Sequence, residues 1–288
     1  MKVLFISKNE LPDFQCDMVF HGLRTLLGSD CIDANTLWYM YDGTMQEFWN
    51  SMIPNNGKSY GNGFTLYGLL ENIDIDRTDI YNKIRSHYYD KIVYGSITRC
   101  DDYLNTVSQF YKKDDIILID GEDNTEINMK YFGIGVYYKR ELIYDISDYL
   151  KPINFCIPKN LIVDLVPVKQ KDYGYIIPGD LSTYIYNNQD EYYNDYAISY
   201  YGVTYKKGGW DCLRHYEILM NGCMPFFPGL QECPVNTMTL FPKMIVHQNN
   251  EILKNSGLPE NYNHVMQQLI DHTKKYLTTE YTAKLILQ

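Results

Sequence analysis

The residues with the clearest potential for chemistry lie in the segment from Ser199 to Pro228, which reads SYYGVTYKKGGWDCLRHYEILMNGCMPFFP. Within it, a run of two lysines and two glycines, Lys206 to Gly209, is followed by Arg214. Glycines allow a backbone to approach a ligand closely, and clustered cations attract negative charge. These residue types at this spacing suit a phosphate or a diphosphate. The alternative is a solvated loop whose lysines bind no ligand.

The pattern around these residues predicts a strand, a turn, a helix and a strand. The run from Ser199 to Thr204 is typical of a strand, the spacing from Asp211 to Met220 is helical, and a second apolar run follows at Met224 to Phe227. This order is that of a βαβ unit. The glycine turn therefore precedes a helix, whose free first-turn amides favour an anion.

A group of acids forms the second candidate site. Asp120, Glu122 and Asp123 follow the apolar run from Asp115 to Ile119, which predicts a strand. In an open parallel sheet, ligands bind beyond the carboxyl ends of the strands. The three carboxylates would therefore supply a general base or bind an acceptor molecule. The alternative is that they cap the next helix and turn.

Asp17 and His21 lie one turn apart in a segment of helical spacing that ends at Leu27. Residues four apart share one face of a helix, so an aspartate and a histidine placed in this way can act together as a base. The alternative is a structural histidine whose hydrogen bonds are satisfied inside the protein.

Common motifs of nucleotide and metal chemistry are absent from the sequence. The turn from Ser7 to Asp13 lacks the GxGxxG pattern of dinucleotide-binding proteins, and the chain contains no Walker lysine loop. Asp74 and Asp76 form a DxD, but they precede a predicted helix start at Asp79 and do not end a strand. The histidines show no HxH or HExxH spacing. The sequence therefore predicts neither a metal site nor a bound cofactor.

The composition is that of a globular protein with a substantial core. Of the 288 residues, 45% are hydrophobic and 22% are charged. The formal net charge of −10 argues against an extended surface for nucleic acid or for an anionic membrane, because such a surface needs clustered Lys and Arg. A local basic cleft remains compatible with this charge.

The cysteines and the first residues predict where the protein is found. The chain has seven cysteines and no CxxC pair, which is typical of reduced, buried thiols in a cytoplasmic protein. The apolar core of MKVLFISKNELPD is too short for a signal peptide, and no apolar run reaches the ~18 residues of a transmembrane helix. We therefore expect a soluble, cytoplasmic protein without a transmembrane segment.

The order of elements predicts an α/β fold. Strand and helix patterns alternate in both halves, and Pro152 and Pro158 interrupt the periodicity between them. We expect two Rossmann-like domains that face each other across a cleft, an acceptor-side domain at 1–150 and a second domain at 151–270 that carries the lysine and glycine turn. A C-terminal helix, 271–288, is expected to pack back on the first domain.

The individual elements follow from periodicity and turn residues. The segment from Asn35 to Asn62 ends in a glycine- and asparagine-rich loop and is expected to be an irregular surface excursion, with a mobile acceptor-side loop as the alternative. Strands are expected at Val3–Ser7, Cys31–Asp33, Lys91–Tyr94, Asp115–Ile119, Val136–Tyr138, Leu161–Val166, Tyr173–Ile177 and Lys243–His247, and further helices at Asp79–Tyr89, Asp101–Tyr111, Asp190–Tyr196 and Tyr262–Leu287.

Taken together, these residues resemble the GT-B glycosyltransferases. The segment GWDCLRHYEILMNGCMPFF is similar to the nucleotide-sugar segment of exostosin-like and related viral and bacterial members, in which a basic residue and a glycine turn precede an Arg-x-x-Glu helix and a small-Gly-x-Pro sequence. HGLR at His21 to Arg24, IDGED at Ile119 to Asp123 and KREL at Lys139 to Leu142 are also similar.

The resemblance implies roles for the residues of the C-terminal segment. Glu217 would hold the ribose hydroxyls of the nucleotide, and Arg214 with Lys206 or Lys207 would neutralise the diphosphate that leaves during transfer. Many retaining members carry a second glutamate eight residues before the ribose-binding one, where this chain has Gly209. Asp211 is the candidate substitute, and the stereochemistry of transfer stays open. The donor-binding set is Lys206, Lys207, Gly208, Gly209, Asp211, Arg214 and Glu217.

The same resemblance implies a reaction. It is the transfer of a hexose or pentose from a nucleoside-diphosphate sugar, with UDP as the commonest nucleotide among relatives, to an acceptor hydroxyl without a metal. An inverting mechanism needs a carboxylate as base, and Asp120, Glu122 and Asp17, the last paired with His21, are the candidates. A glycan is the expected acceptor. The alternatives are a phage-type transferase acting on hydroxymethylated DNA bases and a nucleotide- or sugar-binding protein without catalysis.

Overall fold

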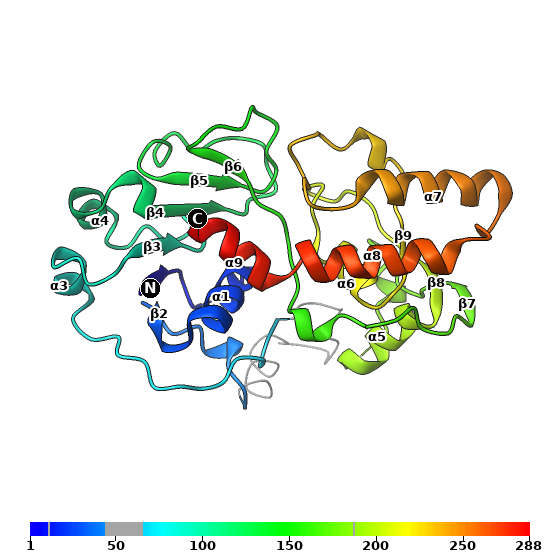
Figure 1. Ribbon diagram of the computed structural model, residues 1–288, viewed down its shortest axis with the longest axis horizontal. Helices are drawn as coiled ribbons and strands as arrows, with labels where there is room; N and C mark the ends of the chain where they lie inside the picture. The colour runs from blue at the N-terminus through cyan, green and yellow to red at the C-terminus, as the bar shows by residue number, and fades with distance from the viewer. Residues whose placement is uncertain (11, 44–65, 187) are drawn as a thin grey trace.

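The computed structural model describes residues 1–10, 12–43, 66–186 and 188–288. These residues form two parallel sheets, one with six strands in the order β2-β1-β3-β4-β5-β6 and one with three strands in the order β7-β8-β9 (Figure 1). Helices flank the six-stranded sheet. The predicted α/β class is thus confirmed, and the larger sheet is compatible with a Rossmann-like fold.

The six-stranded sheet is built from the first half of the chain and is covered on both faces. Val3 and Phe5 of its strand β1 belong to one hydrophobic cluster, whereas Leu4 and Ile6 belong to another, as the alternation of a strand requires. Because both faces are covered, β1 is apolar throughout and β3 and β4 are apolar except at one end. The elements are β1 (Val3–Ile6), β2 (Cys31–Asp33), β3 (Lys91–Tyr94), β4 (Ile116–Asp120), β5 (Val136–Lys139), β6 (Leu150–Pro152), α1 (Phe14–Leu27), α3 (Ile80–Arg85) and α4 (Leu104–Phe110).

The helix α1 begins with a side-chain cap. The Asp13 carboxylate accepts a hydrogen bond from the Cys16 backbone N–H at 3.3 Å. Gly28, with a φ of 55°, ends the helix as the sequence predicts. Asp17 lies in the first turn of this helix, which begins at Phe14. The cap places Asp13 at the carboxyl edge of the sheet.

The three-stranded sheet lies in the second half of the chain. The βαβ unit predicted there is confirmed, because β8 and β9 are parallel neighbours, with Tyr201 opposite Met224, and α6 connects them. A Cβ at Gly202 of β8 would lie 2.8 Å from the Ile218 side chain, so glycine allows α6 to pack closely on the sheet. The elements are β7 (Lys171–Tyr173), α5 (Gln189–Ala197), β8 (Ser199–Val203), α6 (Leu213–Met220), β9 (Met224–Phe226), α7 (Lys243–Ser256) and α8 (Tyr262–Tyr276).

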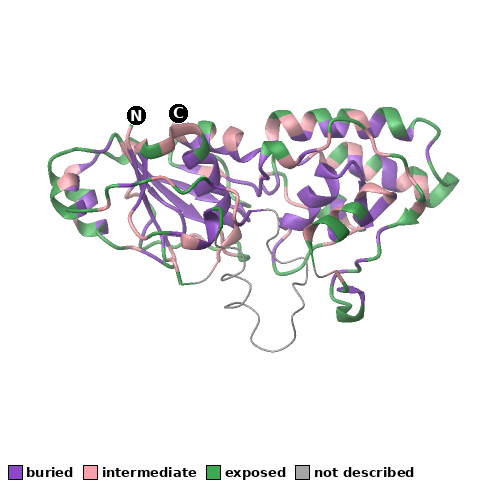
Figure 2. Cartoon of the chain, turned by 90° about the horizontal axis from the view of Figure 1, so that it is seen from below, coloured by how far each residue is buried: buried purple, intermediate pink, exposed green. Residues whose placement is uncertain are grey.

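The last helix returns to the first half of the chain. While α8 packs on α6, α9 (Thr279–Leu287) packs on α1, and Figure 1 shows α9 beside α1. The approach is close at Gly22, where a Cβ would lie 2.0 Å from the Thr279 carbonyl oxygen. Figure 2 shows buried residues at the centre of both halves. One hydrophobic cluster includes Phe20 of α1, Tyr216 of α6 and Ala283 of α9, so the halves share part of their core.

Two predicted strands of the second half are wrong. Lys243 to His247 is the first part of α7, in which Val246, Asn249 and Asn250 are the buried residues. This spacing is helical, and Pro242 directly before the helix suits its start. Residues 162–166 follow the short 3₁₀ helix Lys159–Leu161 and pair with none of the described strands, with Leu165 73% exposed. A short apolar run does not by itself distinguish these structures.

Other boundaries differ less from the sequence predictions. The strand expected at Tyr173–Ile177 is Lys171–Tyr173, and β6 continues the first sheet past the predicted boundary at residue 150. The C-terminal helix is divided, because the Thr278 hydroxyl caps α9 by accepting a hydrogen bond from the Tyr281 N–H. Most of the predicted excursion at Asn35 to Asn62 lies outside the described residues. All seven cysteines are described and free, and five of them are buried.

Candidate functional site

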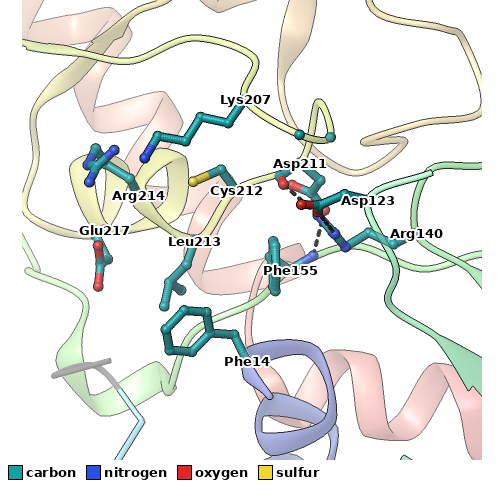
Figure 3. A pocket seen from close by; sticks show the side chains of 12 residues that line it. Phe14, Asp123, Arg140, Phe155, Lys207, Asp211, Cys212, Leu213, Arg214 and Glu217 are labelled. Atoms are coloured by element: carbon teal, nitrogen blue, oxygen red, sulfur yellow. Dashed lines mark hydrogen bonds and ion pairs between the residues drawn. The ribbon is translucent and has the colours of Figure 1, made fainter. Parts of the chain in front are cut away.

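Two adjoining cavities lie beyond the carboxyl ends of β4, β5 and β8, where ligands bind in parallel sheets. The α6 cavity, of about 220 Å³, is shown in Figure 3. The β4 cavity has about 260 Å³. Phe14, Asp123, Arg140 and Phe155 line both, so the two are neighbours. The other lining residues of the α6 cavity are Lys207, Gly208, Gly209, Asp211, Cys212, Leu213, Arg214 and Glu217, and those of the β4 cavity are Pro12, Asp13, Gln15, Arg99, Gly121 and Glu122.

Arg214 is a buried cation in the wall of the α6 cavity. Its side chain is 8% exposed, and its Nη2 donates to the Tyr184 hydroxyl at 3.1 Å. Its Nε has no hydrogen-bond partner among the residues that the structure describes. Its guanidinium forms no ion pair with any carboxylate in the same set. A buried charge normally has a partner, so this arginine is well suited to an anionic ligand.

Glu217 lies one turn beyond Arg214 on the same face of α6 and is 1% exposed. Its Oε2 accepts a hydrogen bond from the Tyr192 hydroxyl at 2.7 Å, which fixes the carboxylate. A carboxylate has several acceptor positions, so this lining residue suits ligand hydroxyls. Figure 3 shows Arg214 and Glu217 at the same end of the cavity.

The two lysines of the predicted anion site differ in place. Lys207 lines the α6 cavity, and its ammonium group points toward Arg214 (Figure 3). Lys206 does not line the cavity, and its ammonium group lies 5.0 Å from the centroid of the Trp210 ring. Cys212, the N-cap residue of α6, forms no side-chain cap, so the first-turn amides of α6 add positive potential at the cavity.

Arg140 connects the walls of the two cavities. Its Nη2 donates to the Gly121 carbonyl oxygen at 2.8 Å and to the Asp123 carboxylate, and its Nη1 donates to the Asp211 carbonyl oxygen at 2.5 Å. The guanidinium also stacks on the Phe155 ring, 4.6 Å from the ring centroid. The side chain is 3% exposed. Its bonds fix the loop after β4 against the loop before α6.

Glu141 holds the turn before α6 through both of its carboxylate oxygens. Its two carboxylate oxygens accept hydrogen bonds from the backbone N–H groups of Trp210 and Asp211, both at 2.9 Å. A Cβ at Gly209 would lie 2.4 Å from Glu141 Oε1. The Gly209 backbone therefore packs directly against the Glu141 carboxylate. A side chain at position 209 would fit only if Glu141 moved.

The Asp211 carboxylate is engaged inside the protein. It accepts hydrogen bonds from the Phe155 N–H at 2.8 Å and from the Tyr216 hydroxyl at 2.7 Å. Burial raises the pKa of this carboxyl to about 6. Asp211 therefore contributes to the cavity wall mainly by fixing Phe155 and the start of α6.

Of the predicted base candidates, Glu122 is the one that lines the β4 cavity. Its Oε1 accepts hydrogen bonds from the Thr98 hydroxyl at 3.1 Å and from Arg99 Nε at 3.2 Å. Arg99 also pairs with the Asp13 carboxylate at 2.9 Å. The β4 cavity thus contains two carboxylates bridged by a half-exposed arginine, with Asp123 at its border with the α6 cavity.

Asp120, Asp17 and His21 do not line either cavity. Asp120 is 1% exposed, and its carboxylate pairs with Lys139 at 2.9 Å and accepts from the Tyr137 hydroxyl at 2.5 Å. This buried ion pair gives Asp120 a structural role within the sheet.

Asp17 and His21, both in α1, contact different partners. The Asp17 carboxylate accepts from the Tyr39 and Tyr67 hydroxyls, both at 3.1 Å, and burial raises its pKa well above the usual range. His21 Nδ1 lies 2.9 Å from the Thr279 hydroxyl, and burial lowers its pKa to about 4. The helical spacing was correct, but the two side chains do not contact each other as an acid–base pair.

Three residues that line the cavities were not among the predicted site residues: Asp13, Arg99 and Arg140. Arg140 directly follows β5 and Arg99 follows β3, so the carboxyl-end rule used for Asp120 to Asp123 also applies to them. The DxD acid Asp76 lies elsewhere, where it pairs with Lys83 at 2.8 Å.

No protein-family model matches this chain, and no curated protein matches it either. Within the described ranges, no helix has the length and apolar character needed to cross a membrane. Over the same ranges, His, Cys, Asp and Glu side chains form no group of three or more that could hold a metal ion. The function is therefore inferred from the two cavities and the residues that line them.

Proposed function

We propose that the protein is a glycosyltransferase of GT-B type that transfers a sugar from a nucleoside-diphosphate donor, with a UDP-sugar as the first candidate, to an acceptor hydroxyl. The observation that carries the proposal is Arg214. It is a buried cation without a carboxylate partner among the described residues, and it lines a cavity at the start of α6 beside Glu217. These are the groups that a nucleoside diphosphate needs.

The groups that line the α6 cavity suit the nucleotide-sugar donor in one orientation. The diphosphate binds Arg214, Lys207 and the first-turn amides of α6, because these groups carry or direct positive charge. The ribose hydroxyls bind Glu217, whose carboxylate accepts hydrogen bonds. Lys206 is left outside, since it lies on the Trp210 ring.

The same cations assist the chemical step. The bond between the sugar and the diphosphate breaks, and negative charge grows on the leaving oxygen. Arg214 and Lys207 are in place to stabilise that charge in the transition state. In this proposal they replace the metal ion that other transferases use, so transfer should continue in the presence of EDTA.

The acceptor binds in the β4 cavity. Glu122 lines it from the end of β4 and is the candidate for the base that removes the proton from the acceptor hydroxyl. The carboxylates of Asp13 and Asp123 favour a polyhydroxy acceptor such as a glycan over the phosphates of DNA, which they repel. The shared residues Phe14 and Phe155 separate the donor side from the acceptor side.

A panel of nucleotides tests the donor part of the proposal. Thermal unfolding is followed with UDP, GDP, CMP and ADP and with their sugar conjugates. A ligand that binds only the native state at about 100 times its Kd adds about 2.7 kcal/mol of stability. At least one nucleoside diphosphate should raise the Tm, and no response to any diphosphate would overturn the proposal.

Release of free nucleotide tests catalysis. The protein is incubated with the stabilising nucleotide sugar and EDTA. The released nucleoside diphosphate is measured without acceptor and with a panel of glycans. Slow hydrolysis that accelerates with a glycan is the expected result. Tight binding without any turnover would instead support a binding protein that lacks catalysis.

A further inference from the structure

We infer that Asp123 contacts the transferred sugar and makes the protein bind donors of neutral sugars more tightly than donors of sugar acids. The inference rests on the proposed function, because it concerns the sugar that the donor carries. It starts from the border between the two cavities, which is formed by Phe14, Asp123, Arg140 and Phe155.

The order of groups in the cleft places the sugar at this border. Figure 3 shows Glu217 and Arg214 at one end of the α6 cavity, Cys212 in the middle, and Asp123 with Arg140 at the other end. If the ribose lies at Glu217 and the diphosphate at Arg214, the sugar continues toward Asp123. Its reacting carbon then faces the β4 cavity, where the acceptor binds. The two cavities adjoin at the place where the two substrates have to meet.

The border offers an apolar platform and one accessible carboxylate. Phe14 and Phe155 line both cavities, and aromatic rings suit the C–H face of a sugar. The Asp123 side chain is 63% exposed, whereas Arg140 is 3% exposed and its N–H groups are bound to Gly121, Asp211, Glu141 and Asp123. Asp123 is therefore the border group that is free to accept hydrogen bonds from sugar hydroxyls.

The loop that contains Lys207 and Gly208 packs closely against Asp123. A Cβ at Gly208 would lie 2.4 Å from Asp123 Oδ2, so the loop approaches this carboxylate directly. Arg140 holds Oδ1 of the same carboxylate, which fixes its orientation. The loop that carries Lys207 and the residue that meets the sugar are therefore positioned together.

Electrostatics then defines the sugar class. A uronic acid would bring a carboxylate beside Asp123, with Glu122 in the adjoining cavity. The Arg140 guanidinium is already paired with Asp123 and Glu141, so it does not offset the repulsion between the like charges. A neutral hexose instead offers hydroxyl donors to Asp123. The donor should therefore be a nucleotide-linked neutral sugar.

Isothermal calorimetry with UDP, UDP-glucose and UDP-glucuronate tests the inference on the wild-type protein, Asp123→Asn and Glu126→Gln. Glu126→Gln is the matched control, because Glu126 is exposed and lies outside the lining of both cavities. Wild type and the control should bind UDP-glucose at least about tenfold more tightly than UDP-glucuronate, equivalent to about 1.4 kcal/mol. Asp123→Asn should reduce this preference to about threefold or less and leave the Kd for UDP unchanged.

The outcomes separate this inference from the proposed function. Absence of binding of UDP and of every other nucleoside diphosphate to the wild type would overturn both. Binding of UDP together with equal affinity of the wild type for the two UDP-sugars would overturn the role of Asp123 alone, and so would a preference that Asp123→Asn leaves intact. Because the wild-type preference is measured directly, the inference can be contradicted even if the variant does not fold.

Discussion

The Glu141 side chain occupies the space beside Gly209, where an added Cβ would lie 2.4 Å from Glu141 Oε1. The carboxylate reaches this place from the end of β5, in the first half of the chain, and binds the N–H groups of Trp210 and Asp211. The turn that precedes α6 is thus positioned by a residue that follows a strand of the other sheet. This relationship explains why a larger side chain at position 209 does not fit unless Glu141 moves.

Gly209→Ala should destabilise the protein. Glu141 is 1% exposed and bound to two backbone N–H groups, so it cannot move away without loss of those bonds. Overpacking of this kind costs about 1 to 3 kcal/mol. Urea unfolding measures the change. Gly208→Ala is the comparison, because its neighbour Asp123 is 63% exposed and is held by one ion pair to Arg140, so it gives way at a smaller cost than the buried Glu141. An equal loss in both variants would contradict this account of the turn.

Glu122→Gln should abolish most of the transfer while leaving donor binding intact. A general base contributes about 10² to 10⁴ in rate, and glutamine cannot accept the proton. The measurement is the initial rate of diphosphate release with a saturating acceptor, together with the Kd for UDP. Glu126→Gln, which removes an exposed acid outside the cavities, should keep the wild-type rate. Full activity of Glu122→Gln would exclude Glu122 as the base and direct attention to Asp13.

His21→Gln should remove part of the acid sensitivity of the fold. The pKa of His21 is lowered by burial from 6.5 to about 4 in the folded protein, so the unfolded chain binds a proton more readily. Its contribution to stability is present above pH 6.5 and is lost as the pH falls toward 4. Glutamine can still hydrogen-bond the Thr279 hydroxyl.

The test of His21 compares the unfolding free energies of wild type and His21→Gln at pH 7 and pH 4.5. The wild type should lose roughly 2 to 3 kcal/mol more than the variant on acidification. Equal losses would show that His21 is not buried as a neutral side chain. Other buried groups, such as His215, are common to both proteins and cancel in the comparison.

Lys207→Ala should weaken UDP binding, whereas Lys206→Ala should not. Lys207 lines the α6 cavity with its ammonium directed toward Arg214, and Lys206 lies on Trp210. Because Lys207 is exposed, the loss should be modest, about three- to tenfold in Kd. Fluorescence competition with a labelled nucleotide measures both variants, which share the same change of charge. A larger effect for Lys206→Ala would place the diphosphate elsewhere.

The sequence predicted the local elements better than the orientation of individual side chains. The strand Lys91–Tyr94 and the unit β8-α6-β9 followed from apolar runs, glycine turns and helical spacing, which are local properties. Asp17 was placed on a helix correctly, but its rotation toward Tyr39 and Tyr67 depends on which face of α1 packs inward. Periodicity alone does not specify the partners of a buried polar group.

The parts of the cleft that the predictions lacked are contacts between distant segments. Arg140 reaches the Asp211 carbonyl oxygen and Glu141 reaches the Trp210 N–H, across about 70 residues of sequence separation in each case. No local pattern marks such pairs. Lys243 to His247 shows the opposite problem, since a short apolar run fits a strand until the buried positions Val246, Asn249 and Asn250 show helical spacing.

The most direct test of the central claim is the affinity of UDP for the wild-type protein and for Arg214→Gln, measured by isothermal calorimetry. The account predicts a 1:1 complex with the wild type and a Kd at least about tenfold higher for Arg214→Gln, since a charge-assisted hydrogen bond is worth about 1.5 to 3 kcal/mol. The variant should remain folded, because it removes a buried charge that has no carboxylate partner among the described residues. Equal affinity of the two proteins for UDP, or no binding of any nucleoside diphosphate to the wild type, would contradict the account.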